Sequence, residues 1–121
     1  MKNEARYIRE FIECYSLHGC DIIIYDNGST DGSDIIVKEY SNVIYYEWRG
    51  IKRQVDAYNH ACKKYRYKYD YIMFYDSDEF LVCEDILRGK TLTQILDDFF
   101  VNGRVGCLCV IWLLVLQLLV L

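Results

Sequence analysis

Two short apolar runs, each ending abruptly in acidic and turn-forming residues, constrain the fold of this chain more than any other feature. Residues 22–25 read Ile-Ile-Ile-Tyr and lead into residues 26–33, Asp-Asn-Gly-Ser-Thr-Asp-Gly-Ser. Residues 71–75, Tyr-Ile-Met-Phe-Tyr, lead in the same way into residues 76–79, Asp-Ser-Asp-Glu. A run of β-forming residues without polar alternation predicts a strand that is buried on both faces, as in a parallel sheet. The turn-forming residues predict a loop at the end of each strand.

Helical and extended patterns alternate along the chain. In order, the predicted elements are a helix over 4–17, a strand over 22–25, a helix over 35–40, a strand over 43–47, a helix over 51–65, a strand over 71–75, and a helix that Thr91 caps and that runs to residue 100. This alternation predicts an α/β fold with a mainly parallel sheet. Because ligands bind beyond the carboxyl ends of parallel strands, both polar loops are expected on one rim of the sheet.

The composition fits one folded domain and argues against several functions. The chain has 121 residues and a net charge of -4, and its basic residues cluster only at 63–68, which indicates a solvated helix end. Nucleic-acid binding would require a clear basic excess, so we expect no nucleic-acid partner. The six cysteines form no Cys-x-x-Cys pair and complete no zinc spacing with the histidines. Since the chain opens without a signal peptide, we expect reduced cysteines in a cytoplasmic protein.

The loop at 26–33 has the composition of a ligand-binding turn. Its glycines let the backbone approach a ligand and expose N–H groups. Asp26, at the end of a buried strand, could accept hydrogen bonds from a base or a ribose. The alternative is an ordinary tight strand-to-helix turn with a capping residue.

Asp76 and Asp78 form the second candidate site. In extended geometry their side chains point to the same side, so both carboxylates can converge on one hard divalent cation. Mg²⁺ or Mn²⁺ takes one or two protein carboxylates and completes its shell with diphosphate oxygens and water. An Asp-x-Asp pair is weak evidence by itself, and the alternative is a solvated acidic turn. The apolar residues on both sides favour the cation site, because burying carboxylates among them requires compensation.

The predicted helix over 51–65 offers a third candidate. Its polar residues could hydrogen-bond a nucleotide or a sugar; they are Arg53, Gln54, Tyr58, Asn59 and His60. The alternative is an ordinary amphipathic helix with a polar outer face.

Together these segments resemble the group of glycosyltransferases formed by families 2 and 92. The matching pieces are Lys-Asn-Glu at 2–4, residues 25–33, Gln54 with residues 57–60, and residues 74–81. They occur in the family's order over about residues 1 to 104. Four ordered pieces are far more specific than any one of them.

The resemblance implies a nucleotide-diphospho-sugar transferase with the A-type fold, a three-layer α/β sandwich. It would transfer a sugar, from a UDP-sugar, to a hydroxyl of a glycan or another acceptor with inversion. Asp76 and Asp78 would hold Mn²⁺ or Mg²⁺. The residues that the resemblance places at the nucleotide-sugar are Lys2, Asn3, Glu4, Asp26, Gly28, Ser29, Asp31, Gln54 and Asp76. It assigns no catalytic base, and Glu79, Glu84 and Asp85 have equal claims.

The chain departs from the family pattern at both ends. Met1 stands where the family has an apolar strand, so we expect an incomplete sheet in a partial domain over residues 1–112. Residues 113–121 form a Leu/Val run that departs from the family, as a truncated gene or a shifted reading frame would produce. The run is short for a spanning helix. It could form an exposed patch that associates or aggregates, which we favour, or attach the chain peripherally to the inner face of a membrane.

Two other functions compete with an active transferase. The chain could be a non-catalytic fragment that retains at most nucleotide and metal binding. A nucleotidyltransferase shares the layout, but it uses a Gly-rich basic loop for triphosphate that is not found here. The transferase interpretation requires the loops at 26–33 and 76–79 to open onto a common pocket. Placement of Asp26 and Asp78 on opposite sides of the sheet would contradict it.

Overall fold

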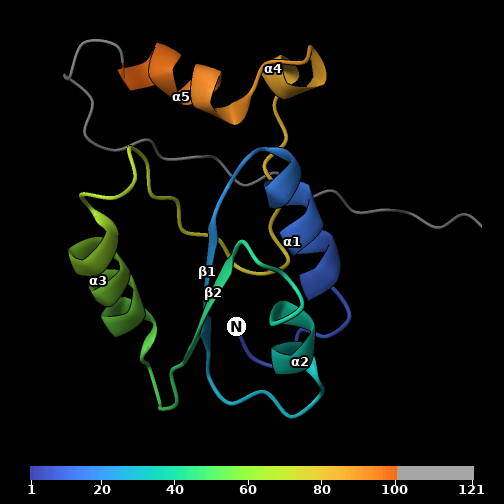
Figure 1. Cartoon of the computed structure of the whole chain (residues 1–121), viewed down its shortest axis with the longest axis vertical. Helices are drawn as coiled ribbons and strands as arrows, with labels where there is room; N and C mark the ends of the chain where they lie inside the picture. The colour runs from blue at the N-terminus through green and yellow to red at the C-terminus, as the bar shows by residue number, and fades with distance from the viewer. Residues whose placement is uncertain (101–121) are drawn as a thin grey trace, which may run out of the picture. The chain divides into compact units, whose positions relative to one another are not determined.

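The computed structural model describes residues 1–100, which fall into two compact units, the second of which begins at Cys83. The first unit contains α1 (Ile8–Leu17), β1 (Ile22–Asp26), α2 (Ser33–Val37), β2 (Val43–Glu47) and α3 (Gln54–Tyr65). The second contains α4 (Glu84–Leu87) and α5 (Leu92–Phe100) (Figure 1). The predicted domain limit at 112 and the apolar tail over 113–121 lie outside the described residues.

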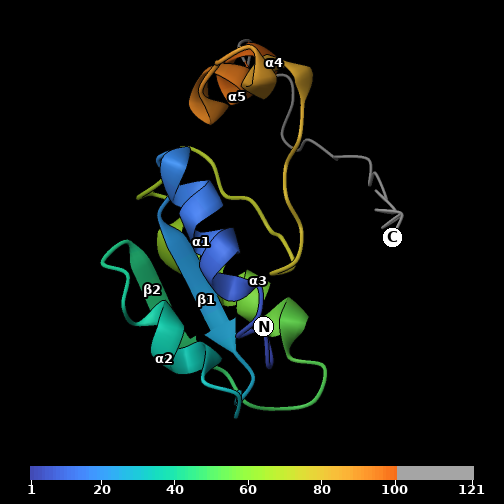
Figure 2. The ribbon, with the colours of Figure 1, turned by 90° about the vertical axis from the view of Figure 1, so that its right-hand side faces the viewer.

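β1 and β2 form a two-stranded parallel sheet, as predicted. Ile22 pairs with Val43 and Asp26 pairs with Glu47, so the two strands end level with each other. The connections that follow them therefore leave the sheet at the same end, where the N-terminus also lies (Figure 2). This end is the carboxyl edge at which the sequence predicts ligand binding.

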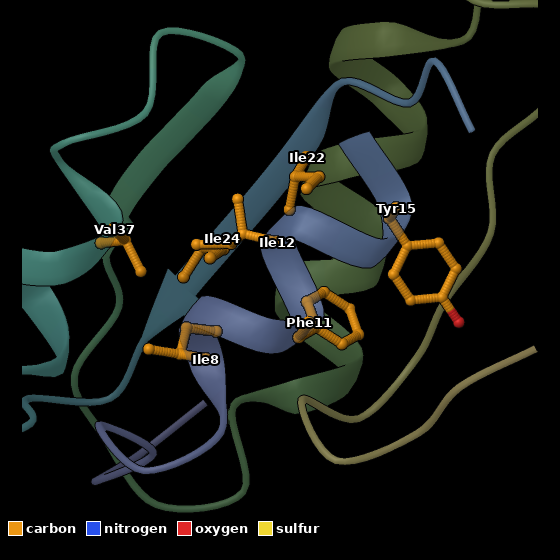
Figure 3. Close-up of a cluster of buried hydrophobic side chains, with 7 residues drawn as sticks. All are labelled: Ile8, Phe11, Ile12, Tyr15, Ile22, Ile24 and Val37. Atoms are coloured by element: carbon orange, nitrogen blue, oxygen red, sulfur yellow. The ribbon is translucent and has the colours of Figure 1, made fainter. Parts of the chain in front are cut away.

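Helices cover both faces of the sheet, with α1 and α2 on one face and α3 on the other (Figure 1). A cluster of buried side chains from α1, β1 and α2 forms the core on the first face (Figure 3). Its members are Ile8, Phe11, Ile12, Tyr15, Ile22, Ile24 and Val37. Full burial of an aliphatic side chain of this size contributes about 1.5–3 kcal/mol. The cluster therefore anchors α1 and α2 firmly against β1.

The face beneath α3 is aromatic. Ala57 and Ala61 are buried on α3. The hydroxyl of Tyr25 lies 2.7 Å from Nδ1 of His60, and the Tyr25 ring stacks on Tyr46 with 5.2 Å between ring centroids. His60 thus packs against the sheet and does not lie on the polar outer face that the amphipathic interpretation gave it.

The third strand predicted over residues 71–75 is absent: within the described chain these residues form no strand. The physical reason is pairing, because a strand exists only where a neighbour completes its ladder. At the carboxyl end of β1, the edge opposite β2 is bonded by the main chain of Met1. The Met1 amine donates to the Tyr25 carbonyl at 2.7 Å, and the Asn27 amide donates to the Met1 carbonyl at 3.0 Å. The apolar run at 71–75 therefore packs as an irregular segment.

The second unit begins with α4, which the sequence did not predict, and continues with the predicted helix α5. The Gln94 amide donates to Oγ1 of Thr91 at 3.2 Å, and the Thr91 amide donates to Oε1 of Gln94 at 2.9 Å. This reciprocal pair is a capping box, and it confirms Thr91 as the cap. Within residues 1–100, no helix has the length and apolar character needed to cross a membrane.

Candidate functional site

Asp26 closes β1 and is buried, with 2% of its surface exposed. Its Oδ1 accepts hydrogen bonds from the Ser29 amide at 3.0 Å and the Ser29 hydroxyl at 2.6 Å, and its Oδ2 accepts one from the Tyr45 hydroxyl at 2.8 Å. These donors compensate the burial of a carboxylate. A nucleotide that bonds to Asp26 would have to displace Ser29 or Tyr45, and such a contact remains a prediction.

Residues 3–5 are bound to the loop that follows β1, and we call this set of bonds the N-terminal clasp. Its bonds run from the Asn3 amide to Ser29 Oγ (2.8 Å), from the Thr30 amide to Asn3 Oδ1 (2.9 Å), from the Glu4 amide to Ser33 Oγ (2.8 Å) and from the Ala5 amide to Asp31 Oδ2 (2.9 Å). The structure thus brings together four residues predicted at the nucleotide-sugar, namely Asn3, Glu4, Ser29 and Asp31. The four bonds of the clasp fix the shape of the loop.

Asp31 is the most strongly stabilised carboxylate of the clasp. Its Oδ1 accepts hydrogen bonds from the Ser33 hydroxyl and from the Ser33 amide, while its Oδ2 accepts one from the Ala5 amide. The Ser33 hydroxyl is the main reason that the pKa of Asp31 falls below its ordinary value, and the Ala5 amide adds to the effect. Asp31 is therefore ionised at neutral pH, with its charge directed at backbone amides.

Residues 76–79 form a tight acidic turn. The Glu79 amide donates to the Asp76 carbonyl at 3.0 Å, and the Asp76 amide donates to Oε2 of Glu79 at 3.0 Å. The Tyr15 hydroxyl of α1 holds the turn by donating to the Glu79 carbonyl at 3.2 Å and accepting from the Leu81 amide at 3.1 Å. The residues Asp76 and Asp78 are exposed. The turn therefore presents both carboxylates from a fixed backbone.

The Met1 amine relates the two polar loops in space. Burial lowers the pKa of this amine, while the charges of Asp26, Glu4 and Asp76 act in the opposite direction. In both views the yellow segment that carries the acidic turn passes close to the N-terminus (Figures 1 and 2). Asp26 of the first loop and Asp76 of the second therefore both act electrostatically on this amine.

The acidic turn has a donor set that suits a hard divalent cation. Within residues 1–100 no group of three or more His, Cys, Asp or Glu side chains forms a ready-made metal site. A cation shared with phosphates needs only one or two carboxylates, which Asp76 and Asp78 supply. In the described part of the chain, Oε1 of Glu79 is buried without a hydrogen-bond partner. This oxygen lacks a donor, and the assignment of Mg²⁺ or Mn²⁺ to Asp76 and Asp78 remains a prediction.

Gln54 is less clearly part of the site. It begins α3, is exposed, and donates from Nε2 to the Tyr58 hydroxyl at 2.7 Å. Among the described residues it makes no hydrogen bond to the clasp or to the acidic turn. Its assignment to the nucleotide-sugar remains a prediction.

A pocket of about 580 Å³ adjoins the loop that follows β1. Its lining residues are Lys2, Asn27, Gly28, Arg49, Gly50, Ile51 and Lys52. Lys2 and Gly28 were expected near a ligand, whereas Arg49 and Lys52 were missed. The sequence could have indicated them, because Arg49 and Gly50 closely follow the predicted strand at 43–47. Ligands bind beyond the carboxyl ends of parallel strands, and this strand is one of them.

The family of this chain follows from comparison with known proteins. The sequence model of glycosyltransferase family 92 matches residues 2–109. The chain belongs to glycosyltransferase family 92. A family 92 protein of Ricinus communis is 32% identical over 107 residues, which cover 80% of this chain and 18% of that protein. A family 92 protein of Arabidopsis thaliana is 32% identical over 83 residues, which cover 64% of this chain and 14% of that protein.

This family 92 chain spans less than a fifth of the length of either plant relative. No solved structure matches it. The matched range includes every predicted site residue, from Lys2 to Asp78. The resemblance to family 92 is confirmed, and the resemblance to family 2 remains a prediction.

Proposed function

We propose that this family 92 chain binds the nucleotide-sugar donor of a glycosyltransferase with the A-type fold. The reaction would transfer a sugar from a UDP-sugar to a hydroxyl of a glycan or another acceptor, with inversion. The observation that carries the proposal is that Asp26 and Asp76 both act electrostatically on the Met1 amine, which donates to the Tyr25 carbonyl at the carboxyl end of the sheet. Parallel α/β sheets bind their ligands at this edge.

Each part of the site has a distinct role in the proposal. The N-terminal clasp holds the loop over 26–33 in the conformation that receives the nucleotide. Asp76 and Asp78 hold Mn²⁺ or Mg²⁺, and a cation bound there would offset the charge that develops on the leaving diphosphate. Tyr15 keeps the acidic turn in place through its two hydrogen bonds.

The three carboxylates considered as catalytic base differ in the partners that they have in the structure. Glu84 is ion-paired with Arg88, and Asp85 lies 3.6 Å from Nζ of Lys90. Of the three, Glu79 is the one with a buried oxygen that lacks a hydrogen-bond partner in the described part of the chain. A base must accept a proton from the acceptor hydroxyl, so Glu79 is the preferred candidate.

Donor hydrolysis tests this function. Purified chain with Mn²⁺ should slowly release UDP from a UDP-hexose, and Asp78→Asn should lower that rate about a hundredfold or more, because the cation loses a ligand. Asp70→Asn is the matched control, since Asp70 is an exposed aspartate outside the acidic turn. Equal rates in Asp78→Asn and the wild type would refute the metal site.

The second candidate is donor binding without transfer. It would show as UDP binding that depends on Mn²⁺ and on Asp78, with no release of UDP from any UDP-hexose. Calorimetry of UDP with and without Mn²⁺ therefore separates the two functions. If UDP does not bind under either condition, both are wrong.

A further inference from the structure

The pocket beside the clasp is built by three separate segments of the chain. Lys2 precedes the clasp, Asn27 and Gly28 follow β1, and residues 49–52 follow β2. The two strand-end connections are tied together, because Oδ1 of Asn27 accepts a hydrogen bond from the Gly50 amide at 2.8 Å. Its volume of about 580 Å³ is that of a small-molecule site.

The lining of this pocket is cationic in a chain whose net charge is -4. Lys2, Arg49 and Lys52 all line it, and none of the lining residues is acidic. Arg49 is ion-paired with Glu47, which stands outside the lining. Among residues 1–100, neither lysine forms an ion pair. The pocket thus retains positive charge that the protein itself does not neutralise.

The backbone around the pocket adopts conformations that side chains usually avoid. Gly28 and Gly50 have φ angles of 76° and 139°, and Lys52 has a φ of 54° although it carries a side chain. A Cβ atom at Gly28 would lie 3.4 Å from Nε of Arg49, so the glycine leaves the guanidinium group room beside the loop. Strained residues of this kind cluster at ligand sites.

We propose that Lys2, Arg49 and Lys52 bind the phosphate groups of the donor nucleotide directly, without a metal ion. Arginine and lysine are the side chains that recognise phosphate, and the exposed glycine backbone allows close approach. The assignment of this phosphate to the donor nucleotide rests on the proposed function. The existence of an anion site rests only on the residues of the pocket. A phosphorylated acceptor is the other source of the same group.

The test uses the whole chain in EDTA, with inorganic pyrophosphate, UDP and uridine titrated separately by calorimetry. Pyrophosphate and UDP should bind, uridine should bind more weakly, and rising salt should lower the affinity for both anions. The double variant Arg49→Gln/Lys52→Gln should lower the pyrophosphate affinity about tenfold or more. The matched control is Lys63→Gln/Arg66→Gln, which removes the same two charge types from exposed positions at the end of α3.

A second variant guards against misfolding. Lys52→Gly removes the charge and also suits the positive φ, so it should fold at least as well as the wild type and still bind pyrophosphate less tightly. The proposal is overturned if Arg49→Gln/Lys52→Gln and Lys52→Gly both bind pyrophosphate as tightly as the wild type. It is also overturned if the wild type does not bind pyrophosphate in EDTA.

Competition identifies the source of the phosphate. UDP that displaces pyrophosphate supports the donor, whereas UDP that does not displace it overturns that assignment in favour of an acceptor phosphate. Asp78→Asn should keep pyrophosphate binding in EDTA. The chain could fail to release UDP and still bind pyrophosphate in a manner that depends on Arg49. That result would refute the transferase function and support the anion site.

Discussion

The Tyr45 hydroxyl on β2 donates a hydrogen bond to Oδ2 of Asp26 on β1, with 2.8 Å between the two oxygens. Desolvation, reinforced by this bond to the carboxylate, raises the pKa of Tyr45 to about 12. Tyr45 therefore stays neutral and remains a donor throughout the physiological range. The buried carboxylate at the end of β1 depends on a side chain from the neighbouring strand.

Removal of this hydroxyl should destabilise the first unit. Tyr45→Phe leaves a buried carboxylate oxygen with one donor fewer, and a lost bond to a charged group costs about 1.5–3 kcal/mol. Urea unfolding at pH 7 measures the loss. Tyr67→Phe is the control, because Tyr67 is 88% exposed. Equal stability of the two variants would show that Asp26 does not need Tyr45.

The lowered pKa of Asp31 predicts how stability depends on pH. A carboxylate whose pKa is lower in the folded than in the unfolded state stabilises the protein above its unfolded pKa, about 3.9, and loses that contribution as the pH falls through the folded value. Asp31→Asn should therefore be less stable than the wild type at pH 7, and the difference should shrink below pH 4. Urea unfolding at both pH values, with Asp70→Asn as control, checks this expectation. A difference that grows at low pH would contradict it.

Substitution of two glycines that share one backbone conformation can separate the cost of backbone strain from an effect on ligand binding. Gly19 and Gly28 have φ angles of 75° and 76°, but of the two only Gly28 has neighbours within 4 Å of an added Cβ, and the three nearest are atoms of Arg49. Alanine at either position should cost about 1–2 kcal/mol of unfolding free energy, because the left-handed conformation crowds the Cβ. Only Gly28→Ala should also weaken pyrophosphate binding, since its methyl group enters the pocket. Equal pyrophosphate affinities of the two variants would separate Gly28 from the anion site.

Tyr15 should control the order of the acidic turn. The hydroxyl of this α1 residue accepts a hydrogen bond from the Leu81 amide and donates one to the Glu79 carbonyl. Tyr15→Phe removes both bonds, which together contribute about 1–3 kcal/mol. Hydrogen exchange of the Leu81 amide should accelerate, and Mn²⁺-dependent UDP release should require more UDP-hexose. Unchanged exchange at Leu81 would show that other contacts hold the turn.

Much of the first unit was predictable because its signals are local. The apolar run at 22–25 and the turn residues after it predict a strand and a loop, and in the second unit Thr91 predicts a helix start. The family, too, could be inferred from short motifs in order. Each of these features depends on residues that are neighbours in the chain.

Tertiary structure alone decided which residues meet. Residues 71–75 have the composition of a strand, yet strand formation requires a pairing edge, and composition cannot supply one. Lys2, Arg49 and Lys52 look like scattered surface charges until the parallel register of β1 and β2 brings both strand-end connections to the same end of the sheet. Local sequence determines the conformation of a segment, whereas proximity between distant charges arises only when the backbone has been paired and packed.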